Sequence, residues 1–286
     1  MNLFYDPRCL DFGSNLHPEQ PARLERTSAY LMDAHPDWTW IEPVAAEAEA
    51  VRRAHAEEHL VRLQQAEDFD EDTPFHDGIA EHALRAAGAA VEAVGAVLEG
   101  RGPSMALMRP PGHHATAKDA MGFCYLNNVA IAALHAREAC GLARVAVWDF
   151  DAHHGNGTEA ILLGRDGVLV TSVHQYPGYP NTGVVTEGNC HNWPISPGAH
   201  RREHLAALRG ALACVKDFKP DLVLVSAGFD AYRGDPLTDM MLELEDFSTL
   251  GRWLRATKLP AAAMLEGGYS RELPQLVDAF LSSWAD

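Results

Sequence analysis

Residues 148–157 read Trp-Asp-Phe-Asp-Ala-His-His-Gly-Asn-Gly and place two carboxylates and two imidazoles directly after an apolar run. If this segment continues as an extended strand, side chains two residues apart project to the same side. Asp149, Asp151 and His153 would then form one row of ionisable groups. Burying such a row is costly unless something compensates the charge. A divalent metal ion, which takes oxygen and nitrogen ligands, would do so.

A catalytic zinc ion usually has three protein ligands and one open position. Asp230, which follows a short apolar run and the tripeptide Ser-Ala-Gly, is the best candidate for the third ligand. The predicted metal site is therefore Asp151, His153 and Asp230, with Asp149 behind it as a supporting acid.

The segment His-Ala-Glu-Glu-His at residues 55–59 is a weaker candidate for a metal site. A zinc-protease helix requires Glu directly after the first histidine, where this chain has Ala56. His55 and His59 are therefore expected to be exposed histidines on a helix, and the Ala-rich 45–58 region is expected to be an ordinary amphipathic helix.

Strand-length apolar runs alternate with longer segments of helical spacing along the chain. The apolar runs are Met105–Met108, Val145–Trp148, Val168–Val173, Leu222–Val225 and Ala261–Leu265, and the helical segments include Glu81–Leu98, Asn128–Glu138 and His204–Phe218. This alternation predicts an α/β fold with a single open, mostly parallel sheet and helices on both faces. No linker, repeat or low-complexity tract divides the sequence, so one domain over residues 1–286 is expected.

The polar residues collect at the carboxyl ends of these runs, where open parallel sheets bind their ligands. The segments that meet there are residues 109–114, 149–157, 172–183, 226–230 and 265–269. They contain the tandem pair His113-His114 as well as the predicted metal ligands, so the carboxyl edge of the sheet is the predicted functional face.

Composition excludes several classes of function. The 286-residue chain has a formal net charge of −17 at pH 7 and no extended basic run, which argues against a nucleic-acid partner. Its five cysteines are scattered and form no C-x-x-C pair, so no disulfide framework is indicated. No signal peptide or membrane-spanning segment is recognisable, and a cytoplasmic location is expected. The Ala/Arg-rich, Lys-poor composition favours a bacterial source.

Six segments together resemble the zinc-dependent histone deacetylase family, and its bacterial, class II-like branch fits best. They are HPEQPARL (17–24), RPPGHHA (109–115), GFCYLNNVAIA (122–132), DFDAHHGNGT (149–158), SAGFDA (226–231) and EGGY (266–269). They occur in the family's order across nearly the whole chain. The resemblance implies the arginase/deacetylase fold and removal of acyl groups from lysine by metal-activated water.

The resemblance also implies roles for individual residues. Zinc would be held by Asp151, His153 and Asp230, the same set that the spacing predicts. His114 would be the general base and acid, His113 would be oriented by Asp149, and Tyr269 would donate to the developing oxyanion. Asn156 stands behind His114 where class I members carry an aspartate.

Further residues match the family's substrate tunnel and its structural cation site. Phe123, Tyr179, Gly122 and Leu237 would line the tunnel, Asp72 would grip the substrate backbone at its rim, and Arg23 would line the acetate exit path. A potassium ion would be bound by Asp149 and Ser172 and by backbone oxygens that include that of Val173. The expected partner is an acyl-lysine protein or peptide, or a small acylated amine.

Three alternatives remain open. An acetylpolyamine deacetylase shares the catalytic residues, but Leu237 follows Asp235-Pro236 where one branch uses an acidic gatekeeper. A binuclear manganese hydrolase of the arginase type would need acids where this chain has Gly155 and Gly228. A non-catalytic acyl-lysine binder would be expected to lack one of the catalytic residues.

Overall fold

The computed structural model describes residues 1–285 as one eight-stranded sheet flanked by helices. The strands are β1 (Asn2–Phe4), β2 (Thr39–Ile41), β3 (Ser104–Ala106), β4 (Val145–Asp149), β5 (Val168–Gln175), β6 (Cys190–Ile195), β7 (Leu222–Ala227) and β8 (Ala261–Leu265). Their order is β2-β1-β3-β8-β7-β4-β5-β6, and every pair is parallel. The predicted fold class is confirmed.

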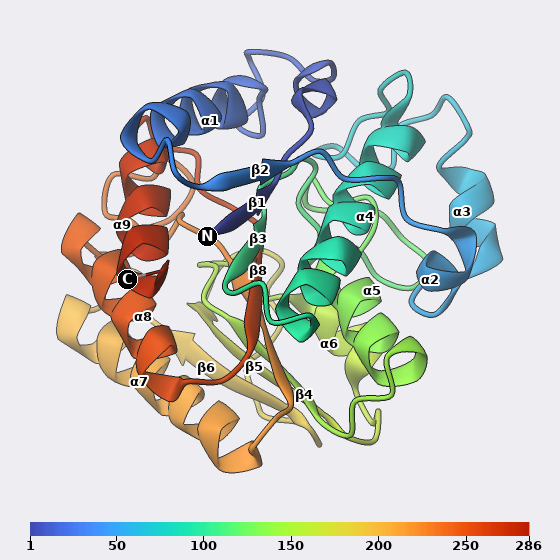
Figure 1. The fold of residues 1–286 in the computed structure, drawn as a ribbon. Helices are drawn as coiled ribbons and strands as arrows, with labels where there is room; N and C mark the ends of the chain where they lie inside the picture. The colour runs from blue at the N-terminus through green and yellow to red at the C-terminus, as the bar shows by residue number, and fades with distance from the viewer. Residues whose placement is uncertain (286) are drawn as a thin grey trace.

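Helices cover both faces of this sheet (Figure 1). They are α1 (Ala22–Ala34), α2 (Ala48–Arg52), α3 (Glu57–Arg62), α4 (Ile79–Leu98), α5 (Asn128–Leu134), α6 (Asn156–Leu162), α7 (Arg201–Phe218), α8 (Leu244–Thr257) and α9 (Leu273–Ala285), with a 3-10 turn at Pro7–Leu10 and a π-helical turn at His135–Ala139. Helices α4, α5 and α6 lie on one face, and α1, α7, α8 and α9 lie on the other. None of the helices in residues 1–285 is long and apolar enough to cross a membrane.

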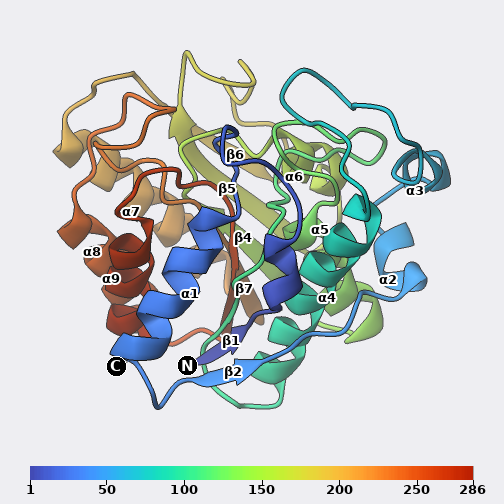
Figure 2. The same cartoon turned by 90° about the horizontal axis from the view of Figure 1, so that it is seen from above.

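The central strands form because their side chains are buried on both faces, as parallel sheets require. Every residue of β4, β7 and β8 is buried, and these strands carry Val, Leu and Ala almost throughout. Their continuous apolar runs end in polar loops at one edge of the sheet, visible along the upper border of Figure 2. That edge contains the residues described below.

The region around residues 45–58 differs from the single amphipathic helix that its composition predicts. Two short helices, α2 and α3, are separated by a break that contains His55. Both His55 and His59 are buried, at 3% and 1% exposure, so their expected exposure was wrong. The physical reason is a set of contacts with a distant segment: the backbone N–H of Asn127 donates to His55 Nε2 at 2.9 Å, and His59 Nε2–H donates to the carbonyl of Tyr125 at 2.7 Å.

Candidate functional site

Asp151, His153 and Asp230 converge just beyond the ends of β4 and β7. One ligand atom from each lies within 4.8 Å of the others, and both carboxylates are completely buried. His153 Nδ1 lies 2.8 Å from Asp230 Oδ2 and 3.2 Å from Asp151 Oδ1. In residues 1–285 this is the one group of three or more such side chains that could hold a metal ion.

Backbone N–H groups orient these two carboxylates. Asp151 accepts from the N–H of His153 at 2.8 Å and from that of Gly267 at 2.7 Å, and Asp230 accepts from the N–H of Ala152 at 2.8 Å. A carboxylate oxygen has more than one lone pair, so these bonds leave acceptor capacity for a cation.

Two glycines make the convergence of the carboxylates possible. A Cβ at position 228 would lie 2.0 Å from Asp151 Oδ2, and one at position 267 would lie 2.2 Å from Asp230 Oδ2. Any larger residue at either position would displace a carboxylate. Glycine at position 228 also adds no carboxylate to the group formed by Asp151, His153 and Asp230.

The electrostatics of the cluster fit a bound cation. Burial and the neighbouring charge of Asp151 together raise the pKa of Asp230, which shows how costly the second buried carboxylate is without compensation. A divalent ion between these oxygen and nitrogen donors would offset that repulsion, and the donor set is one that zinc accepts.

His113 lies against the cluster and bonds to Asp149. Its Nδ1–H donates to Asp149 Oδ2 over 3.1 Å, and both side chains are buried. Burial alone would lower the pKa of His113, but the charges of Asp151 and Asp149 outweigh it and raise the value to about 10. These charges, one of them from the predicted metal ligand Asp151, favour the protonated form of His113.

His114 is in the opposite electrostatic situation. Its Nδ1–H donates to Asn156 Oδ1 over 2.7 Å, and Asn156 is an uncharged partner at the start of α6. Burial, followed by the positive charges of His113 and His153, holds the pKa of His114 well below its usual range. Because Nδ1 carries the proton, Nε2 of the neutral ring has a free lone pair, as a general base requires.

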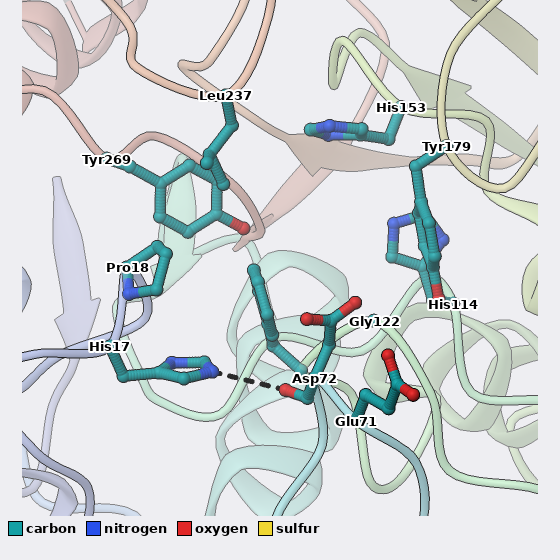
Figure 3. Close-up of a pocket in the computed structure, with 11 residues that line it drawn as sticks. His17, Pro18, Glu71, Asp72, His114, Gly122, His153, Tyr179, Leu237 and Tyr269 are labelled. Carbon is teal, nitrogen blue, oxygen red and sulfur yellow. Dashed lines mark hydrogen bonds between the residues drawn. The ribbon is translucent and has the colours of Figure 1, made fainter.

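A cavity of about 280 Å³ opens above these groups (Figure 3). Its lining residues come from loops at the carboxyl edge of the sheet and are His17, Pro18, Glu71, Asp72, His114, Gly122, Phe123, His153, Tyr179, Leu237 and Tyr269. Figure 3 shows Tyr269 and Leu237 on one side of the opening, facing His153, Tyr179 and His114 on the other. The cavity therefore leads from the protein surface to a predicted metal ligand and to His114.

The walls of the cavity depend on unusual backbone conformations at residues 122 and 123. Gly122 has φ = 56°, and a Cβ there would lie 2.5 Å from the His114 ring and 2.9 Å from Tyr179. Phe123 has φ = 69°, which is rare for a bulky residue, and its N–H donates to Thr73 Oγ1 at 3.1 Å. Such conformations persist where the surroundings fix them, and here they place an aromatic ring in the wall.

Tyr269 is held from behind by Arg23. The Arg23 guanidinium lies 4.8 Å from the centre of the tyrosine ring, and Asp235 accepts the backbone N–H of Tyr269 at 2.7 Å. Arg23 is itself buried and donates to Glu19 and to the carbonyls of Gly268 and Glu266. It does not line the cavity described above, so its predicted place on an exit path stays a prediction.

The residues predicted to bind potassium lie side by side in the sheet. Asp149 and Ser172 are register partners in β4 and β5, and Val173 follows in β5. Ser172 Oγ lies 2.8 Å from His174 Nδ1, and His174 Nε2–H donates to the carbonyl of Gly183 at 3.0 Å. His174 Nδ1 of the neutral ring is therefore the acceptor, and the serine hydroxyl donates its hydrogen to it.

Several contributors to the site were absent from the sequence-based set. His17, Pro18 and Glu71 line the cavity mouth. Glu266 is fully buried and accepts from the N–H groups of Gly112 at 2.7 Å and His113 at 3.1 Å, so it fixes the backbone before the tandem histidines. His17 and Glu266 both lie in segments that carry the family resemblance, which was the available signal; nothing in their spacing indicated these contacts.

Comparison with known proteins agrees with this architecture. The histone deacetylase domain matches residues 17–283. A probable deacetylase of Archaeoglobus fulgidus is 36% identical, with 94% of this chain and 81% of that protein covered. The crystal structure of the HDA15 HD domain superposes with a TM-score of 0.93 at 32% identity and 99% and 88% coverage. The acetylpolyamine aminohydrolase of Burkholderia pseudomallei superposes with a TM-score of 0.90 at 27% identity and 99% and 98% coverage.

The fold and the cluster at its carboxyl edge thus place the protein in the deacetylase and amidohydrolase class. Within that class, the chain belongs to the histone deacetylase family.

Proposed function

We propose that this chain is a zinc-dependent deacylase that removes acetyl or other acyl groups from lysine side chains, using water as the nucleophile. One observation carries the proposal: His114, His153 and Tyr269 line the same cavity. A base, a metal ligand and a hydroxyl donor therefore face one space that a substrate can enter.

Asp151, His153 and Asp230 would hold the zinc ion. When bound, zinc supplies Lewis-acid chemistry, which polarises an acyl carbonyl and makes water a better nucleophile at neutral pH. Asp149, Ser172 and backbone oxygens, among them that of Val173, would hold potassium beside it.

His114 moves the proton in this reaction. Its free Nε2 takes a proton from the attacking water and later delivers it to the departing lysine amine. His113, held by Asp149, supports the negative charge that develops, and the hydroxyl of Tyr269 donates to the oxygen of the acyl group. Asn156 keeps the His114 ring in the orientation that this proton transfer requires.

The substrate's alkyl chain would lie between Phe123 and Tyr179, with Gly122 leaving room for it. Leu237 adds apolar surface at the mouth, and Asp72 would accept hydrogen bonds from the substrate backbone. Arg23 would line the route by which acetate leaves.

An acetylpolyamine is the second candidate substrate. Glu71 and Asp72 line the mouth, and within residues 1–285 neither forms an ion pair, so a cationic group would find free carboxylates there. Leu237 on the opposite side offers a cation no such partner, and an acyl-lysine peptide is therefore favoured. We further infer that residues 1–286 act as one catalytic domain in the cytoplasm of a bacterium.

Comparison of acetyl-lysine peptides with N-acetylspermidine as substrates of the zinc-loaded protein tests the proposal. We expect higher kcat/KM for the peptides and loss of activity in His114→Ala. Preference for acetylspermidine would establish the second candidate. Full activity of His114→Ala would refute the assigned base, and binding of acyl-lysine without turnover would indicate a non-catalytic binder.

A further inference from the structure

We propose that His17 is a positioning residue that fixes the acidic loop, residues 67–72, so that Asp72 faces substrate at the cavity mouth. This inference rests on the proposed deacylase function. It concerns recognition of the substrate outside the tunnel and not the chemical step.

The base of His17 is anchored to a buried ion-pair cluster. His17 Nδ1 accepts the backbone N–H of Glu19 at 3.1 Å. The Glu19 carboxylate is 4% exposed, and it accepts from Arg109 at 2.6 and 2.8 Å and from Arg23 at 2.9 Å. Because charge-assisted bonds of this kind are strong, the Glu19 backbone is a rigid support for the imidazole.

The other side of the ring reaches the acidic loop. His17 Nε2 lies 3.2 Å from the carbonyl oxygen of Asp72, shown as the dashed line in Figure 3. A carbonyl oxygen can only accept, so Nε2 carries the hydrogen and Nδ1 of the neutral ring is the acceptor, as its bond with Glu19 requires. These two bonds require the Nε2–H tautomer, in which the 3.3 Å approach of Nδ1 to the Glu19 carbonyl oxygen is a contact and not a hydrogen bond.

The same ring also touches the tunnel wall. Its centre lies 4.7 Å from that of Phe123, edge to face at 78°. Thr73, the residue after Asp72, accepts the N–H of Phe123 at 3.1 Å. His17 thus joins three parts of the mouth: the segment before α1, the acidic loop and the wall.

The remaining bonds of Asp72 are local. Its N–H donates to Asp70 Oδ1 at 3.0 Å within the same exposed turn. Loss of His17 would leave the Asp72 peptide group held by that turn on one side and by Thr73 on the other. We expect the Asp72 carboxylate to become less ordered, which weakens recognition of substrates that extend to the rim.

Three substitutions of His17 test whether it acts through its bond to Asp72 or only through its bond to Glu19. His17→Ala removes both bonds, His17→Gln has the length to place an amide donor near the position of Nε2, and His17→Asn retains only a short acceptor for the Glu19 N–H. His191→Ala, which changes a histidine on β6 outside the cavity, is the matched control. Each variant is assayed with an acetyl-lysine peptide and with free Nε-acetyl-lysine, which has no flanking residues.

For the peptide, we expect KM to rise about three- to ten-fold in His17→Ala and His17→Asn, as for loss of one hydrogen bond. His17→Gln should restore it, and kcat should stay within about two-fold throughout, because the chemical groups are untouched. Kinetics with free acetyl-lysine should change less than those with the peptide, because this substrate does not extend to the rim. In an Asp72→Ala background, His17→Ala should add nothing further to the peptide KM.

Three outcomes would each overturn the proposal. They are an equal rise in KM for peptide and free acetyl-lysine in His17→Ala, a peptide KM restored as fully by His17→Asn as by His17→Gln, and additive effects of His17→Ala and Asp72→Ala on the peptide KM. Hydrogen exchange gives a readout that needs no activity. The backbone amides of Asp72, Thr73 and Phe123 should exchange faster in His17→Ala than in His17→Gln, and equal rates would also overturn it. Inactivity of the parent on every acyl substrate would instead refute the proposed function and leave the exchange test in force.

Discussion

The uncharged partner of His114 gives a sharp test of the proposed base. Asn156 Oδ1 accepts the His114 Nδ1–H at 2.7 Å, while its Nδ2 donates to the His114 carbonyl at 3.4 Å and to Met121 Sδ. Asn156→Asp keeps the size and the acceptor atom but places a negative charge against the ring. The substitution therefore changes the electrostatics of His114 with little change in shape.

The direction and size of the effect follow from this geometry. An opposite charge within about 4–6 Å shifts a pKa by about 1–3 units toward the charged form, and 2.7 Å in a buried site is closer still. The pKa of His114, which burial and two neighbouring histidines now hold well below its usual range, should therefore rise. A general base works when it is neutral. The acid limb of the kcat/KM profile should accordingly move to higher pH by about 1–3 units.

The assay is kcat/KM for an acetyl-lysine peptide across about pH 5–9, with zinc loading checked in each variant. Gln64→Glu, which adds the same charge at an exposed position after α3, controls for the general effect of charge. An acid limb that stays in place, or that moves to lower pH, would show that His114 is not the base.

Three further results are expected. Tyr269→Phe keeps the ring against Arg23 and removes only the hydroxyl, so kcat should fall about 10²–10³-fold with KM little changed, and an unchanged kcat would exclude the donor role. Removal of metal by a chelator should abolish hydrolysis and lower Tm, because buried Asp151 and Asp230 lose their counter-charge. Native mass spectrometry of the loaded protein should find one divalent ion per chain. Two ions per chain would favour a binuclear enzyme. Burial lowers the pKa of His204 to about 4, and within residues 1–285 neither of its ring nitrogens has a hydrogen-bond partner. As pH falls from about 6.5 to 4, His204 becomes protonated in the unfolded chain but stays neutral in the folded one, so the free energy of unfolding of the parent should fall by roughly 3 kcal/mol. His204→Leu should not show this loss. Denaturant titrations at several pH values measure it, and the same dependence of unfolding free energy on pH in both proteins would contradict the prediction.

The sequence predicted the central strands well and the edge strands poorly, for one physical reason. Strands β4, β5, β7 and β8 are almost entirely buried, so each contains a largely apolar run that is visible in the sequence. Strands β1 and β2 have three residues each, too few to show a period, and β6 is half-exposed and contains Pro194. Their pairing depends on neighbours that are distant in sequence.

The residues of the candidate metal group could be predicted because they directly follow the apolar runs of β4 and β7, and the carboxyl ends of such parallel strands meet at one edge of the sheet. The entrance could not be predicted in this way. His17 and Asp72 are far apart in the chain and meet through a side chain and a backbone carbonyl in irregular loops. Buried His55 and His59 illustrate the same limit, because their helix-like spacing suggested exposure while their contacts with residues 125–127 bury them.

The sequence shows which residues could bind the metal ion, but it does not show how their carboxylates are oriented. Asp151 and Asp230 are named by the sequence, but their orientation depends on the backbone N–H groups of Ala152, His153 and Gly267. Every non-proline residue has such a group, so no residue type marks these donors. The sequence does carry one trace of the arrangement: Gly267 has no Cβ to fill the space 2.2 Å from Asp230 Oδ2, and a glycine is what lets its N–H approach the neighbouring carboxylate so closely. The glycines beside the acids therefore belong to the metal site as much as the ligands do.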